Sequence, residues 1–198
     1  MAARYKLVAD PPSGLRYLPD FITEDEEQYL LAKIGELDFK AVVLLGVEAK
    51  RTVVPFGFDY AYDFRDVHPI GALPSWLHDL RDRAANVAQL PGENFDQSLV
   101  TRYPAGAGIG WHRDAPKFDS TVLGLSLASE AMLRFRRTID GATQQYVLRL
   151  AARSLYVMSG AARWVWQHSL NPTKALRYSI TLRCVRRTAK QAADVSSC

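Results

Sequence analysis

The segment Arg177-Tyr178-Ser179-Ile180-Thr181-Leu182-Arg183 alternates strictly between polar and apolar side chains. A period of two is the pattern of a β-strand with one face on a core. Six more short segments upstream have strand-like composition, with turn residues between them. They are Ser98–Tyr103, Thr121–Leu127, Met132–Arg136, Tyr146–Leu150, Ser154–Met158 and Arg163–Gln167, and the seventh strand spans Leu176–Cys184. Seven closely spaced strands predict a β-sandwich or barrel.

The N-terminal half has a different period. Thr23 and Glu26 form the sequence pattern of a capping box, so we expect a helix from Thr23 to about residue 37. A second helix is predicted over Ser75–Leu90, after Pro74 and before Pro91-Gly92. The aromatic-rich segment Arg51–Phe64 predicts a hairpin, and residues 1–19 an extended arm. The expected fold is therefore mainly β with N-terminal helices, an α+β protein built on a jelly roll.

Length and composition describe an ordinary folded domain. The chain has 198 residues and a mass of 22.2 kDa, with 48% hydrophobic and 23% charged residues. This balance excludes intrinsic disorder, and 198 residues fit one domain. We expect a single domain over 1–198, with helices in 1–95, a jelly-roll core in 96–187 and a flexible tail in 188–198. Two cysteines exclude a disulfide framework, and we see neither a secretory signal nor a membrane span, so we expect a cytoplasmic monomer.

Positive charge is concentrated at the C-terminal end. Residues 131–198 hold 12 Lys and Arg against 2 Asp and Glu, whereas residues 1–130 hold 13 against 19. Such an asymmetry indicates a polyanionic partner or an anionic ligand. A solvated basic face is the alternative interpretation.

Three side chains form a candidate metal site. His112 and Asp114 are two residues apart in an extended segment, so both can point to one side. His168 lies far downstream, and we expect it on an opposing strand of the sandwich. Two histidines and one carboxylate are the facial triad of non-haem iron(II), with open positions for substrates. Zinc would accept the same donors and would indicate a hydrolase, and a core histidine bonded to backbone is the structural alternative for His168.

Arginines at both ends of one strand face suggest a site for a small dianion. Arg177, Ser179, Thr181 and Arg183 share the polar face, and each guanidinium can form a bidentate contact with a carboxylate. Combined with the triad, this face fits 2-oxoglutarate, which chelates iron(II) and needs a cation for its second carboxylate. Tyr103 could add a phenolic donor. A basic edge strand that resists aggregation is the alternative.

These motifs resemble the AlkB family of iron(II)- and 2-oxoglutarate-dependent dioxygenases. The stretch 101–114, TRYPAGAGIGWHRD, is similar to the family's Asn-Arg-Tyr…His-x-Asp pattern, and Arg177–Arg183 to its Arg-x5-Arg signature. The resemblance implies a double-stranded β-helix with a nucleotide-recognition lid. It implies iron ligation by His112, Asp114 and His168, and 2-oxoglutarate binding by Tyr103, Arg177, Ser179 and Arg183. Arg183 would contact the co-substrate or Asp114, and Tyr60 in the lid would stack on a flipped base.

Three positions depart from the family pattern. Thr101 and Ser179 stand where asparagine is frequent, which removes amide hydrogen bonds to the co-substrate. Pro116 replaces an acidic residue that reads the base in some members, so the preferred lesion is open.

The implied reaction is oxidative demethylation or dealkylation of N-alkylated bases in DNA, or also in RNA, using iron(II), 2-oxoglutarate and O2. The alternative keeps this chemistry but acts on a modified tRNA base or a protein side chain. A third interpretation is a catalytically silent nucleic-acid-binding module on the same fold.

Overall fold

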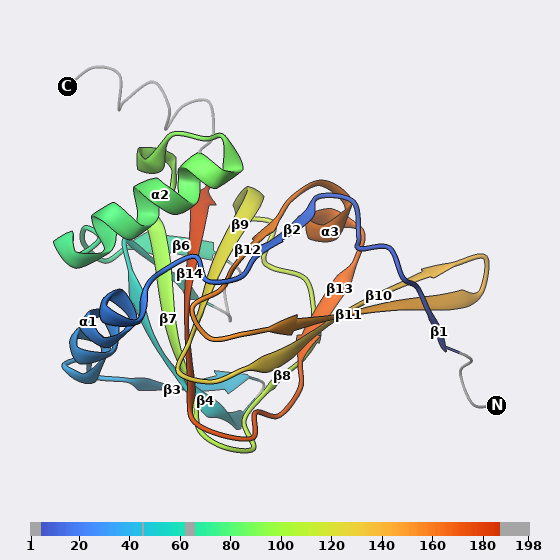
Figure 1. The fold of residues 1–198 in the computed structure, drawn as a ribbon, viewed down its shortest axis with the longest axis horizontal. Helices are drawn as coiled ribbons and strands as arrows, with labels where there is room; N and C mark the ends of the chain where they lie inside the picture. The colour runs from blue at the N-terminus through green and yellow to red at the C-terminus, as the bar shows by residue number, and fades with distance from the viewer. Residues whose placement is uncertain (1–4, 45, 62–65, 187–198) are drawn as a thin grey trace.

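Two β-sheets face each other, and two helices cover the far side of the larger sheet (Figure 1). The computed structural model describes residues 5–44, 46–61 and 66–186. The five-stranded sheet has the order β1 (Tyr5–Leu7), β11 (Ala142–Leu150), β10 (Ala131–Ile139), β13 (Gln167–Leu170) and β8 (Ile109–His112). The seven-stranded sheet has the order β2 (Leu15–Leu18), β12 (Leu155–Met158), β9 (Phe118–Leu127), β14 (Arg177–Val185), β7 (Gln97–Tyr103), β4 (Val47–Phe56) and β3 (Lys40–Leu44). The jelly-roll expectation is confirmed.

Alternation along β14 divides the molecule into two layers. Ile180 and Leu182 face the helices and pack in a core with residues of α1, α2, β9 and β12. The other side of the seven-stranded sheet faces the five-stranded sheet across a second core, which includes Val122, Leu133 and Phe135. The polar side chains of β14 therefore point between the two sheets, where the sequence alone left a solvent-facing edge strand as an alternative.

Both N-terminal helices form where the sequence predicts them. Helix α1 spans Glu24–Gly35, and Thr23 and Glu26 make the reciprocal hydrogen bonds of the capping box. Helix α2 spans His78–Ala88, directly after a 3-10 turn at Ser75–Leu77. No helix in the described ranges is long and apolar enough to cross a membrane.

The strand predicted at Arg163–Gln167 is wrong. Residues Gly160–Trp164 form helix α3, and the following strand β13 begins only at Gln167. The sequence Arg-Trp-Val-Trp-Gln imitates a period of two, but the adjacent residues Ala162 and Arg163 are both buried, whereas a strand would turn them to opposite faces.

The expected hairpin over Arg51–Phe64 is also wrong. Strand β4 pairs with β3 and β7, whereas β5 (Phe58–Ala61) pairs with β6 (Asp66–Pro69) in a separate two-stranded sheet. Gly57 separates β4 from β5 with a φ of +76°, and a Cβ there would lie 1.8 Å from the carbonyl oxygen of Asp96. Only glycine suits this positive φ and close approach. Phe64 falls outside the described residues.

Residues 1–95 contribute more than helices and a lid. The expected extended arm contains β1, parallel to β11, and β2, antiparallel to β12, and β3 and β4 extend the seven-stranded sheet. The expected boundary at residue 95 therefore does not follow the sheets. The tail 188–198 lies outside the described residues.

Candidate active site between the sheets

A cavity of about 710 Å³ lies between the two sheets. One wall comes from β7 and β14, and the other from β8, β13 and the loop after β8. All the sequence-predicted site residues line it: Tyr60, Tyr103, His112, Asp114, His168, Arg177, Ser179 and Arg183. The fold therefore gathers these residues from five separate segments into one place.

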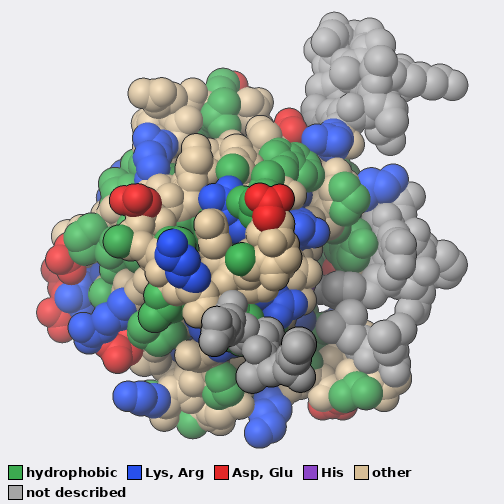
Figure 2. Space-filling view, turned by 90° about the vertical axis from the view of Figure 1, so that its right-hand side faces the viewer, with side chains coloured by type: hydrophobic (Ala, Val, Ile, Leu, Met, Phe, Trp, Pro, Cys, Tyr) green, Lys and Arg blue, Asp and Glu red, His purple; other side chains and the backbone are tan. Residues whose placement is uncertain are grey.

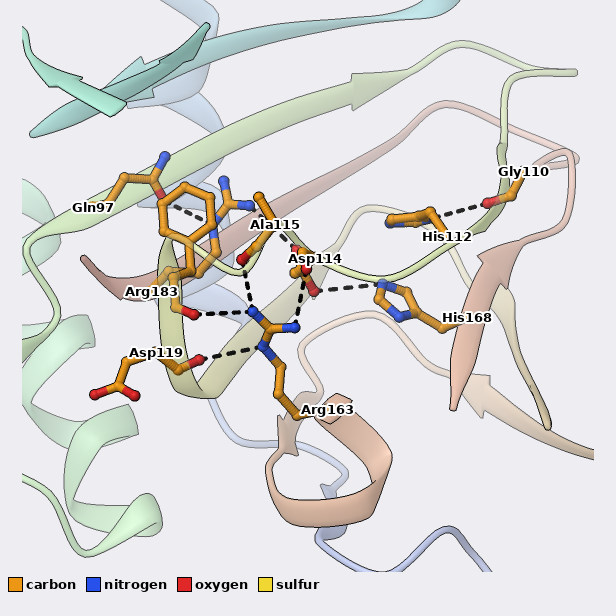
Figure 3. A network of polar contacts seen from close by, with 10 residues as sticks. Gln97, Gly110, His112, Asp114, Ala115, Asp119, Arg163, His168 and Arg183 are labelled. Atoms are coloured by element: carbon orange, nitrogen blue, oxygen red, sulfur yellow. Dashed lines mark hydrogen bonds and ion pairs between the residues drawn. The ribbon is translucent and has the colours of Figure 1, made fainter. Parts of the chain in front are cut away.

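The two histidines are direct cross-strand neighbours. β8 and β13 pair antiparallel with His112 opposite His168, and their ring centroids are 4.2 Å apart. Our expectation that they lie on opposing strands of a sandwich is thus corrected, because both belong to the five-stranded sheet. Asp114 follows β8 by two residues, and its Oδ2 lies 3.6 Å from Nε2 of His168 (Figure 3). In the described part of the chain, no three His, Cys, Asp or Glu side chains already enclose one ion site. The three side chains of the candidate triad are close neighbours, but their donor atoms do not yet surround one point where an ion could bind.

The protonation states of these groups suit a cation. The carbonyl of Gly110 lies 2.8 Å from Nδ1 of His112, a contact that favours the tautomer with the proton on Nδ1 and leaves Nε2 as a lone-pair donor. Burial lowers the pKa of His168 to about 4, against a partial opposing effect of Asp114, so its imidazole is neutral at pH 7. Among the residues that the structure describes, none forms a hydrogen bond with the buried Nδ1 of His168. Two imidazoles and a carboxylate fit the donor preferences of iron(II).

Asp114 remains ionised despite its burial. Burial by itself raises the pKa of this carboxyl, but His168 while it is protonated in acid, and the permanent charge of Arg183, outweigh burial and lower the pKa. Nη1 of Arg183 lies 3.3 Å from Oδ1 of Asp114, which is one of the two contacts expected for this arginine. Its Nε donates to Oε1 of Gln97 at 2.8 Å.

Arg177 marks the other end of the cavity. The side chain is 2% exposed, its Nε donates to Oγ of Ser126 at 3.0 Å, and its guanidinium lies over the ring of Tyr103, the residue directly opposite on β7. Burial lowers the pKa of Arg177, and Tyr103 counteracts the shift. Ser179 and Thr101 face each other on the same two strands. A buried guanidinium without a carboxylate partner in the described residues is typical of a site for an external anion.

The other residues that the sequence analysis named also lie at the cavity wall. Tyr60 comes from β5, and its ring is 6.1 Å from that of Phe118. Pro116 and Thr101 line the cavity as Ser179 does, so all three departures from the family pattern are located where they can affect what binds there.

Sequence reasoning missed several residues that support the site. Gln97 and Ser126 hold the two arginines. Arg163 donates to the carbonyls of Asp114, Ala115 and Asp119, as Figure 3 shows, and also to that of Phe118. Gln97 could have been found from register, because an antiparallel pairing that sets Tyr103 against Arg177 also sets Gln97 against Arg183. Nothing in the sequence distinguished Arg163 from the other basic residues of the C-terminal third.

Comparisons with known proteins agree with this architecture. The family profile described as 2OG-Fe(II) oxygenase superfamily matches residues 14–183. An Arabidopsis thaliana protein named alkylated DNA repair protein ALKBH8 homolog is 31% identical, with 87% of this chain and 58% of that protein covered. A Xenopus tropicalis protein named tRNA (carboxymethyluridine(34)-5-O)-methyltransferase alkbh8 is 29% identical, with 82% of this chain and 26% of that protein covered.

A solved structure described as that of OsALKBH1 superposes with a TM-score of 0.68 at 14% identity, covering 89% of this chain and 99% of that one, which supports the fold alone. The chain spans only 58% and 26% of the two curated relatives. The profile match, the relatives and the fold agree. The chain therefore belongs to the AlkB family of the 2OG-Fe(II) oxygenase superfamily, a family of iron(II)- and 2-oxoglutarate-dependent dioxygenases.

Proposed function

We propose that this protein oxidatively removes alkyl groups from N-alkylated nucleobases of DNA or RNA. In this proposal His112, Asp114 and His168 bind iron(II), which together with 2-oxoglutarate supplies the activation of O2. The alkyl carbon is hydroxylated and leaves as an aldehyde, while 2-oxoglutarate loses CO2 and becomes succinate. The observation that carries the proposal is the buried Arg177, which faces the same cavity as the His–Asp cluster.

The side chains of this chain would position the reactants. Arg177, with the Tyr103 phenol and the Ser179 hydroxyl, would bind the distal carboxylate of 2-oxoglutarate. Arg183 would hold the Asp114 carboxylate in place, because its Nη1 already lies 3.3 Å from Oδ1 and Gln97 fixes its Nε. The apolar part of the cavity wall, which includes Leu133 and Val122, would keep water away from the reacting atoms.

Several observations favour a nucleic-acid substrate. The C-terminal third carries a strong positive balance, which attracts phosphate. Tyr60 lines the cavity and offers a ring on which a base could stack. The Arabidopsis relative is named for repair of alkylated DNA.

A modified tRNA base is the second candidate. The Xenopus relative is named for a tRNA uridine, although this chain covers only 26% of it. Two further alternatives are that the substrate is a protein side chain and that the protein binds nucleic acid without catalysis. The same experiment addresses both.

The test is succinate formation with iron(II), 2-oxoglutarate and O2, in the presence of a methylated DNA oligonucleotide, a methylated RNA oligonucleotide, bulk tRNA or a protein extract. We expect the oligonucleotides to stimulate succinate formation and to release aldehyde in equal amount. His112→Ala and Asp114→Ala should abolish turnover, while the matched control His78→Ala, whose Nε2 contacts the carbonyl of Leu73 away from the cavity, should not. Stimulation by tRNA alone supports the second candidate. Stimulation only by protein overturns the nucleic-acid assignment, and retained activity in His112→Ala overturns the metal assignment.

A further inference from the structure

A second hollow, of about 550 Å³, lies beside the candidate active site. It forms where β1, β10 and β11 meet the segment between α3 and β13. β1 and the end of the β10–β11 hairpin lie on the right of Figure 1, the side that faces the viewer in Figure 2. Three arginines line it: Arg113 from the loop after β8, and Arg136 and Arg137 from β10. None of the lining residues within the described ranges is acidic. We call these three side chains the arginine hollow.

The arginines are held in place by neutral groups. Nη2 of Arg113 donates to the carbonyl of Val165 at 2.9 Å. Nε of Arg136 donates to Oε1 of Gln167 at 2.9 Å, and Nε of Arg137 to Oε1 of Gln144 at 2.9 Å. Because the Nε atoms are used in this way, the outer nitrogens of both guanidinium groups stay available for an anion.

Tryptophan rings complete the support. The guanidinium of Arg136 lies 4.5 Å from the ring centroid of Trp111, and that of Arg137 lies 4.6 Å from that of Trp166. Stacking on a ring fixes the plane of a guanidinium without neutralising its charge. Among the residues with described structure, no ion pair includes Arg113, Arg136 or Arg137. The hollow therefore holds three oriented and uncompensated charges.

The arginine hollow joins the active-site cavity at Arg113. This residue stands between His112 and Asp114 in the chain and lines both spaces. Trp111, the ring under Arg136, also lines the cavity. A polyanion whose reactive group lies in the cavity would thus find its next negative charges directly over the hollow.

We propose that the arginine hollow binds backbone phosphates of the same nucleic-acid strand whose base occupies the cavity. This inference rests on the proposed function. A phosphodiester backbone is the partner that fits, because it supplies successive anions next to a base and accepts two parallel hydrogen bonds from each guanidinium. Contacts to phosphates carry no base identity, so the hollow would add affinity without changing the preferred lesion.

The experiment compares the double variant Arg136→Gln/Arg137→Gln with wild type. The measurement is fluorescence anisotropy of a methylated single-stranded oligonucleotide over a series of salt concentrations. We expect about 10- to 100-fold weaker binding at low salt, and a log–log salt slope that is shallower by about 1.4 for two lost phosphate contacts on a single strand. Arg149→Gln is the matched control: Arg149 pairs with Glu130 on the same sheet and lines neither space, so its binding should match wild type.

Two further measurements keep the result interpretable. Formation of succinate from 2-oxoglutarate without nucleic acid should be the same in the double variant as in wild type, because neither arginine lines the cavity. Unchanged oligonucleotide affinity and salt slope in the double variant would overturn the assignment of the hollow while leaving the proposed function intact. Equal binding of an acidic peptide of the same charge would also overturn it. A wild-type protein that neither binds nor oxidises any nucleic acid would overturn the proposed function, and this inference with it.

Discussion

At the scale of single residues, the buried Arg163 holds the backbone around Asp114 by hydrogen bonds. It is 1% exposed, and its guanidinium donates to four backbone carbonyls: those of Asp114 and Ala115 in the loop after β8, and those of Phe118 and Asp119 at the start of β9. Burial lowers its pKa, while Asp114 acts in the opposite direction. Residues 113–117 belong to no strand, so Arg163 supplies donors to the Asp114 and Ala115 carbonyls that a neighbouring strand would otherwise provide.

Replacing Arg163 with methionine should destabilise the protein. The substitution leaves several buried carbonyls without donors, and we expect the free energy of unfolding to fall by about 3 kcal/mol. Lysine should recover only part of this loss, because one ammonium cannot reproduce the planar fork. Urea denaturation measures both.

Arg149→Met is the control for the Arg163 variants. Its exposed ion pair with Glu130 should contribute less than about 1 kcal/mol. A similar loss in Arg149→Met and Arg163→Met would contradict the role of Arg163 in holding the loop.

The thiol of Cys184 should be unusually unreactive. Burial, together with Asp96 and Asp119, raises its pKa to about 12. In a Cys198→Ser background, the rate of alkylation by iodoacetamide should keep rising about tenfold per pH unit between pH 8 and 10 in the folded protein. In the urea-unfolded protein it should level off above pH 9. The unfolded chain releases this proton first, so the contribution of Cys184 to stability falls as pH rises from about 9 to about 12. Levelling at pH 9 in both states would contradict the shift.

At the scale of elements, the shape of the cavity depends on the space that β9 leaves for one side chain of the neighbouring strand β12. Gly124 on β9 lies opposite Tyr156 on β12, and a Cβ at Gly124 would lie 2.2 Å from Cζ of the Tyr156 ring. The same ring lines the active-site cavity. Glycine at this position therefore lets the tyrosine lie flat on the sheet and leaves the cavity open.

Gly124→Ala should move the Tyr156 ring and alter the cavity. We expect a loss of about 1–3 kcal/mol in unfolding free energy from overpacking, together with an increased KM for 2-oxoglutarate. Adding Tyr156→Leu should recover stability, because the ring that collides is removed. Gly35→Ala serves as control, since a Cβ there meets nothing within 4 Å, and it should be neutral or stabilising. An unchanged KM in Gly124→Ala would contradict the proposed position of the co-substrate.

At the scale of the whole molecule, each sheet contributes one part of the site. The two histidines belong to the five-stranded sheet, and Arg177 and Arg183 belong to the seven-stranded sheet. A metal–co-substrate pair bound as proposed would therefore connect the sheets and stabilise the fold as a unit.

Thermal unfolding tests this connection. With Mn(II) replacing iron and 2-oxoglutarate at about 100 times its Kd, the melting temperature should rise by about 5–10 °C. Arg177→Met should abolish the increment from 2-oxoglutarate and keep the increment from Mn(II) alone. Loss of both increments would instead indicate that Arg177 supports the metal site or the fold.

The sequence by itself determined the elements whose signals are local. The capping box of α1 and the alternation of β14 depend on neighbours within a few residues, and both formed as predicted. Alternation also implied that Arg177 and Arg183 share a face. The residue types of the His–Asp cluster were equally visible, because the donor preferences of iron(II) are a property of side-chain chemistry.

Only the tertiary structure decided what depends on register and on buried contacts between distant segments. Pairing of β8 with β13 sets His112 opposite His168, and Gln97 and Ser126 become partners of the arginines only because β7 and β9 flank β14. The segment Arg163–Gln167 became helix and loop because Arg163 gained four carbonyl acceptors and Trp166 a place in the core. These free energies come from residues 40 or more positions away, and a local pattern cannot report them.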